Sequence, residues 1–153
     1  MSTDKKFNSP QDLEHVEPRY ALPAGVSEKA FFEATKLAVF PGALLGNWVN
    51  VNPGTRGIVR IALQLSGATF QVHPFGACVP TPCDWGTQPG IAYAANVSST
   101  VPVAFSAMFP AGFKDTIVVG HLENNLLVVE TFNHFKDGSA RSDYYAREVF
   151  HRG

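Results

Sequence analysis

The residue types most able to do chemistry gather in one segment of this chain. Four residues separate His73 from Cys78, four more separate Cys78 from Cys83, and Asp84 and Trp85 follow directly. Imidazole nitrogen and thiolate sulfur are zinc ligands, and three protein ligands with one open position would form a catalytic site. Because this spacing is unusual for zinc and the ligand set is incomplete, a structural loop or a disulfide are the alternatives.

We interpret residues 76–86 as an ordered structural loop without a bound metal. Two prolines between the cysteines stiffen the backbone, while Asp84 supplies a polar anchor and Trp85 an apolar one. Cys78 and Cys83 are expected to lie close enough to bridge under oxidising conditions.

A second set of ionisable residues lies near the end of the chain. If residues 124–125 and 137–138 each form a two-residue turn, Val119 pairs with Glu130, and Glu130 in turn pairs with Tyr145. One face of the resulting hairpins then carries four polar groups: His121, Glu130, Tyr145 and Arg147.

This polar face has two readings. Facing a lumen, Glu130 or His121 would act as a general base, and Tyr145 or Arg147 would stabilise developing negative charge. If the polar face points to solvent instead, the opposite face of these strands lines the interior. A one-residue slip in either turn exchanges the inward and outward faces. The residues of that opposite face are Leu127, Val129, Thr131, Tyr144, Ala146, Glu148 and Phe150.

Composition excludes several classes of function. The 153 residues are 45% apolar and 16% charged, which suits one core, and 12 basic against 13 acidic residues give a net charge of -1. Nucleic acid and membrane surfaces are therefore not expected partners. The first twenty residues have no apolar run, so a cytoplasmic location is expected. Because nucleotide-binding and nucleophile motifs are missing, no cofactor is expected.

Three segments with different patterns must position these residues. Residues 1–26 are polar and contain several prolines, which predicts a flexible or surface-laid arm. Residues 27–40 predict a short helix, with Ser27 as the N-cap and apolar residues at helical spacing. From there the apolar period shortens to about two, so residues 41–153 predict a β-barrel domain.

Eight strand-like runs joined by short turns predict this barrel. Such connections force antiparallel neighbours, and eight strands that close leave a lumen for side chains or one small ligand. The sequence therefore predicts a mainly β fold, an eight-stranded antiparallel up-and-down barrel with the residue 76–86 loop at its mouth. The runs are Asn47 to Val51, Gly57 to Leu65, Ala68 to Phe75, Gly90 to Val97, Val101 to Phe109, Lys114 to Leu122, Leu126 to Phe135 and Arg141 to His151.

Two segments resemble known families. Gly46-Asn47-Trp48 in the first strand, with Arg147 in the last, is similar to the calycin pattern of lipocalins, fatty-acid-binding proteins and avidins, which implies that Arg147 covers Trp48 from inside the barrel. The avidin opening, with an Asn two residues after the Trp, implies that Asn50 faces the ligand. The His73 to Gly86 segment also resembles that of small bacterial proteins with no assigned activity.

Three functions follow as hypotheses. The first is a binding barrel that holds a polar or amphipathic small molecule against Trp48, Asn50, Tyr145 and Arg147, although Trp48 is also expected to seal the base. The second is a cofactor-independent isomerase, cyclase or hydratase using the lumen acid–base residues. The third is an interaction module with a packed lumen, whose outward apolar residues form a homodimer. Those residues would be Val129, Tyr144 and Phe150.

Overall fold

The computed structural model describes residues 39–153. The predicted arm over residues 1–26 lies outside the described residues, as does the predicted helix over 27–40 apart from its last two positions. Residues 39 and 40 are not helical, and within residues 39–153 the helical structure is a single 3-10 turn, Gly42–Leu44. The predicted β-barrel domain, residues 41–153, lies within this described part.

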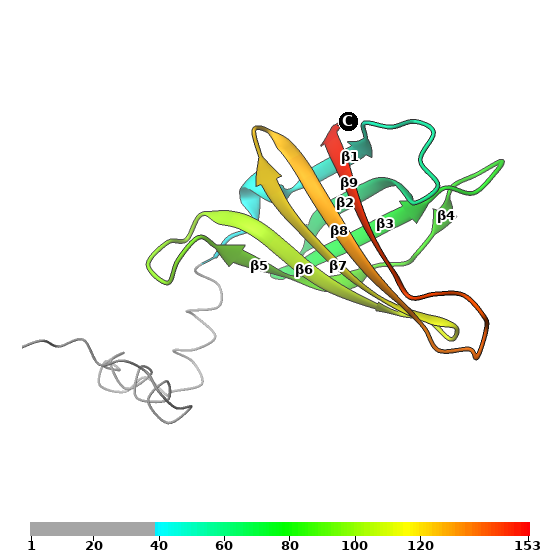
Figure 1. Cartoon of the computed structure of the whole chain (residues 1–153). Coiled ribbons are helices and arrows are strands. Elements are labelled where there is room, and N and C mark those ends of the chain that lie inside the picture. The colour runs from blue at the N-terminus through cyan, green and yellow to red at the C-terminus, as the bar shows by residue number, and fades with distance from the viewer. Residues whose placement is uncertain (1–38) are drawn as a thin grey trace, which may run out of the picture. The chain divides into compact units, whose positions relative to one another are not determined.

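The described strands form one antiparallel sheet that closes on itself (Figure 1). The order β2-β1-β9-β8-β7-β6-β5-β3 is closed by pairing of β2 with β3, and the two-residue β4 adds to the end of β3. The eight-stranded antiparallel barrel is therefore confirmed. Its strands are β1 Gly46–Asn50, β2 Ile58–Ser66, β3 Thr69–Gly76, β4 Cys83–Asp84, β5 Gln88–Ala94, β6 Pro102–Pro110, β7 Lys114–Glu123, β8 Leu126–Phe135 and β9 Tyr144–Arg152.

Alternation of apolar and polar residues builds the interior. Along β8, Leu127, Val129, Thr131 and Asn133 point inward and are buried, because every second side chain of a strand faces the same side. Inward residues from all eight barrel strands fill the lumen toward one end. The fully buried large side chains include Trp48, Phe105, Phe150, Ile58, Ile61, Leu63, Val72 and Val118.

The two predicted turns have different outcomes. Asn124 and Asn125 adopt φ values of 50° and 64°, as a type I′ hairpin requires, and the β7–β8 register is the predicted one. Residues 136–143 instead form a longer loop, because the Asp137 carboxylate accepts from Ser139 N at 3.1 Å and from Arg141 at 2.6 Å. Glu130 consequently pairs with Arg147 rather than with Tyr145.

Trp48 closes one end of the barrel. Its ring is fully buried, and its Nε1 donates to the Leu44 carbonyl at 2.8 Å. The Arg152 guanidinium lies 4.3 Å from the ring centre and donates at 2.7 Å to the carbonyls of Leu45 and Ala43. The arginine expected to cover Trp48 was Arg147. That assignment is wrong, because β9 pairs Arg152 directly with Trp48.

Gly46 leaves the space that the Arg152 guanidinium needs beside β1. Its φ is +134°, and a Cβ there would lie 2.9 Å from Arg152 Nη1. A side chain at this position would therefore both strain the backbone and push the guanidinium away. The Gly-x-Trp spacing thus reflects the packing of Arg152.

We predict that Arg152→Ala lowers the free energy of unfolding by about 1–2 kcal/mol, because two charge-assisted hydrogen bonds and a cation–π contact are lost. Urea unfolding followed by tryptophan fluorescence measures this change. Arg56→Ala is the matched control, since Arg56 is exposed and makes no ion pair within residues 39–153. Equal losses in both variants would contradict a special role for Arg152.

Candidate functional site

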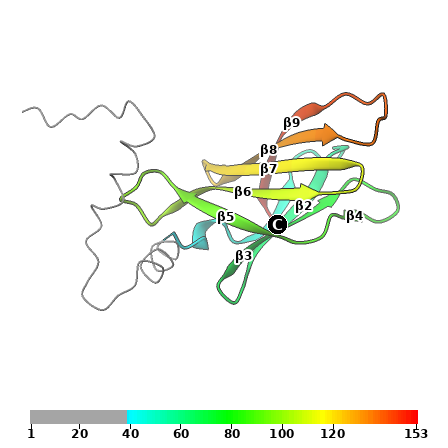
Figure 2. The same ribbon diagram turned by 90° about the horizontal axis from the view of Figure 1, so that it is seen from below.

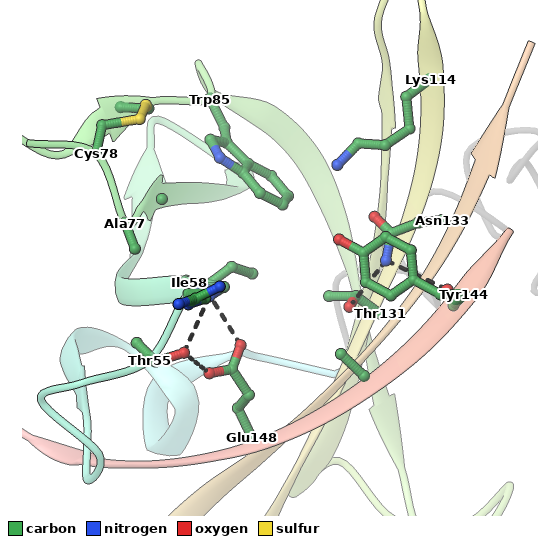
Figure 3. Close-up of a pocket in the computed structure, with 15 residues that line it drawn as sticks. Thr55, Ile58, Ala77, Cys78, Trp85, Lys114, Thr131, Asn133, Tyr144 and Glu148 are labelled. Carbon is green, nitrogen blue, oxygen red and sulfur yellow. Dashed lines mark hydrogen bonds between the residues drawn. A yellow bond between two sulfur atoms is a disulfide. The ribbon is translucent and has the colours of Figure 1, made fainter. Parts of the chain in front are cut away.

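A pocket of 450 Å³, drawn in Figure 3, opens at one end of the barrel, and Trp48 is not among the residues that line it. The first residues of β2, β7 and β9 and the last residues of β3 and β8 form its wall, and the loop containing the cysteines borders it. The lining residues are Thr55, Arg56, Gly57, Ile58, Gly76, Ala77, Cys78, Cys83, Trp85, Lys114, Thr131, Asn133, Tyr144, Ala146 and Glu148.

Glu148 ties three segments together at the edge of this pocket. Its carboxylate accepts from Asn50 Nδ2 at 2.6 Å, from Ile58 N at 3.1 Å and from the Thr55 hydroxyl. Asn50 also donates to the Ile58 carbonyl at 2.9 Å. Asn50 was expected to face the ligand, but it lies behind Glu148 and outside the pocket lining, because its amide is used in this network.

Asn133 forms a second polar network on the pocket wall. Its Oδ1 accepts from the Thr116 hydroxyl at 2.9 Å, and its amide donates to Thr131 Oγ1 at 3.3 Å and to the Tyr144 carbonyl at 3.4 Å. Asn133, Thr116 and Thr131 are all buried. These bonds hold polar side chains inside the barrel in a fixed orientation, which suits recognition of a polar group.

Lys114 brings the ammonium group that points into the pocket in Figure 3. Its Nζ lies 5.0 Å from the centre of the Trp85 ring and 6.0 Å from those of Phe113 and Phe135. Burial, and secondarily the charge of Arg141, lower the Lys114 pKa below its usual value. Among the described residues it has no carboxylate partner within ion-pair distance.

Residues 76–86, here called the mouth loop, contain the disulfide that was one of the alternatives for this segment. Cys78 and Cys83 form a disulfide with Cα atoms 5.3 Å apart. Trp85 packs edge-on against Phe109 with ring centres 6.1 Å apart. Gly76 leaves room for this indole, because a Cβ there would lie 2.7 Å from Trp85 Nε1. The disulfide and the indole thus form one side of the pocket.

His73 and Asp84 do not line the pocket, unlike Cys78 and Cys83. His73 contacts the Asp84 carboxylate at 2.6 Å, and the same carboxylate oxygen accepts from Gly86 N at 2.7 Å. The zinc alternative needed Cys78 and Cys83 as thiolates, and the disulfide removes them. Within residues 39–153 no group of three or more His, Cys, Asp or Glu side chains is arranged to hold a metal ion.

The structure brings Glu130, Tyr145 and Arg147 together, but on the outside of the barrel. Glu130 accepts from the Tyr145 hydroxyl at 2.5 Å, and this bond is the main cause that raises the Tyr145 pKa. Tyr145 is 50% exposed, and His121 contacts Glu123 at 3.0 Å on the same outer surface. The lumen placement of these four residues is wrong, because the opposite face of β8, with its buried Leu127, Val129, Thr131 and Asn133, points into the barrel.

Several pocket residues escaped the sequence-based selection. The sequence pattern places Thr131, Ala146 and Glu148 on the opposite face without a role, and it singles out neither Lys114 nor Asn133. A usable signal was the change along β8 from Leu127 and Val129 to Thr131 and Asn133 on one face. An inward face that turns polar toward one strand end indicates an open barrel mouth.

Comparison with known proteins does not assign this chain to a family. No protein-family model matches the chain, and neither the curated proteins nor the solved structures contain a significant match. In the described part of the chain, no helix is both long and apolar enough to cross a membrane. The cytoplasmic location stays a prediction.

We predict that Glu148→Gln lowers the free energy of unfolding by about 1–3 kcal/mol, because an amide nitrogen replaces one accepting oxygen among three donors. The Ile58 amide should also exchange faster with deuterium. Both effects are measurable by urea unfolding and by hydrogen-exchange NMR. Glu123→Gln, an exposed change on the outer surface, should stay within about 0.5 kcal/mol; a comparable loss there would contradict the prediction.

We predict that the Asp84 carboxyl titrates below its usual pKa of 3.8, first because Gly86 N donates to it and second because of His73. His73→Gln should raise this pKa while leaving it below 3.8. Since the pKa is depressed by folding, its stabilising contribution is complete above 3.8 and is lost as the pH falls through the folded-state value. Carbon-13 NMR titration of the carboxyl measures it, and a value above 3.8 would refute the assignment.

Proposed function

We propose that this protein is a small-molecule-binding barrel whose ligand occupies the pocket at the open end. The observation that carries the proposal is that one half of the barrel lumen is packed with side chains and the other half is open. Apolar side chains pack the half next to Trp48, whereas the other half leaves 450 Å³ bounded by ordered polar groups. Pockets of this size that combine apolar surface with fixed polar groups are typical of small-ligand sites.

The pocket lining suits an amphipathic ligand that carries an anionic group. The Trp85 ring, Ile58 and Ala146 offer apolar surface, and Thr131 and Asn133 offer hydrogen bonds. Glu148 already accepts three hydrogen bonds from the protein. Lys114 and Arg56 therefore remain as the positive charges of the lining that have no ion pair within residues 39–153, and the Lys114 ammonium, which points into the pocket, is the better placed to bind a carboxylate, sulfonate or phosphate group.

A calycin-like assignment is part of this proposal. It is supported by an eight-stranded antiparallel barrel with Gly46 and Trp48 in the first strand and Arg152, on the last strand, stacked over Trp48. The ligand residues differ from those first expected. Trp48 lies in the core, and Tyr145 and Arg147 lie on the outer surface.

The enzymatic alternative loses its geometric basis in this pocket. Glu130 and His121, the expected general bases, both lie on the outer surface of the barrel. The pocket carboxylate, Glu148, is engaged by backbone and side-chain donors that tie the strands together. A binding function uses the pocket as it stands.

Two matched fluorescent probes test the proposal. 8-Anilinonaphthalene-1-sulfonate carries a sulfonate, and N-phenyl-1-naphthylamine has the same aromatic frame without the charge. We predict that Lys114→Met raises the dissociation constant of the sulfonate probe about tenfold, equivalent to about 1.4 kcal/mol, and changes that of the neutral probe less than about twofold. Fluorescence titration at neutral pH gives both constants.

Two further variants locate the bound probes. Ala146→Phe places a ring in the pocket and should abolish binding of both probes. Lys136→Met removes an ammonium that pairs with Asp115 at 2.9 Å outside the pocket, and it should leave both affinities unchanged. Binding that survives Ala146→Phe would place the probes elsewhere and refute the proposed site.

A further inference from the structure

Four large apolar side chains form a continuous stripe across the outer surface of the barrel. Met108 on β6 pairs with Ile117 on β7, which pairs with Phe132 on β8, which pairs with Tyr145 on β9. These strands are consecutive in the sheet, as Figure 2 also shows. Each of the four residues is between 41% and 55% exposed. We call this set the outer stripe.

The outer stripe has the character of a recognition surface. The Phe132 and Tyr145 rings contact each other with centres 5.3 Å apart, and all four side chains line a groove of 500 Å³. Single exposed apolar residues are ordinary on a protein surface, but a contiguous row across four strands marks an interaction site.

Charges flank the stripe in an alternating pattern. On β8, Glu130 lies two residues before Phe132 and His134 two residues after it. Asp143, just before β9, lies two residues before Tyr145, and Arg147 on β9 lies two residues after it. Because β8 and β9 are antiparallel, Glu130 and Arg147 lie on one side of the stripe, and His134 and Asp143, 2.7 Å apart, lie on the other.

This pattern is complementary to itself. A two-fold axis along the stripe would stack each of its four apolar residues on the same residue of a second copy. It would also place Arg147 opposite the second copy's Asp143 and Glu130 opposite its His134. Self-complementarity of this kind is what an isologous dimer requires, and the strands of the two sheets would run nearly aligned.

We propose that the outer stripe is a homodimer interface in which a second copy of this chain packs face to face about a two-fold axis along the stripe. None of the four stripe residues lines the open-end pocket, although Asn133 and Tyr144 line both that pocket and the groove, so the proposal does not rest on the proposed ligand. The homodimer expected from Val129, Tyr144 and Phe150 is thereby reassigned, because Val129 and Phe150 are core residues.

Sedimentation equilibrium of the full chain tests this interface. The wild-type protein should dimerise with a dissociation constant below about 100 micromolar. Phe132→Glu should raise this dissociation constant about 30-fold or more, as expected for a central aromatic residue. Val97→Glu adds the same charge in the loop between β5 and β6, at a residue that is 95% exposed, and it should leave the dimer dissociation constant unchanged. Circular dichroism and thermal unfolding verify that each variant is folded.

Charge variants test the two-fold orientation. Arg147→Glu alone would face Asp143, and Asp143→Lys alone would face Arg147, so each variant should weaken its own dimer. An equimolar mixture should associate more tightly than either variant, since the mixed dimer contains two complementary pairs. A monomeric wild type, a dimer that survives Phe132→Glu, or a mixture without improved association would each overturn the proposal.

Discussion

Closure of the barrel depends on the short seam between β1 and β9. Three residue pairs join these strands, from Trp48 with Arg152 to Asn50 with Phe150. Side chains fasten the seam at both ends. Arg152 holds the carbonyls before β1, and Glu148 holds Asn50 together with the start of β2. Since eight strands surround a single core only while this seam is closed, both the packed half and the pocket depend on it.

The two halves of the lumen illustrate how one alternating pattern serves two purposes. Toward Trp48 the inward side chains are large, apolar and buried from solvent. Toward the other end, Thr131 and Asn133 occupy the same face of β8 and are held by hydrogen bonds to each other and to Thr116. Satisfied polar groups can remain buried there without destabilising the fold.

The sequence was sufficient for the barrel and for the β7–β8 register, because Asn124 and Asn125 define a specific turn geometry. It was insufficient for the site. The side of β8 that faces inward depends on summed burial over all strands, and both faces of β8 carry apolar residues. Likewise, the choice of Arg152 over Arg147 depends on the β1–β9 register, which no turn encodes because these strands are far apart in the chain. The 137–138 turn failed because Asp137 organises a longer loop.

Because the packed end around Trp48 and the open end are built from largely different residues, the pocket can change in sequence while the core is kept. Glu148 both fastens the seam and lines the pocket, while Thr131, Ala146 and Lys114 line the pocket without sharing the seam's hydrogen bonds. Substitutions at these three positions can change the chemistry of the cavity while the buried core around Trp48 stays intact. The barrel is therefore a suitable starting scaffold for selecting new specificities from libraries randomised at its mouth.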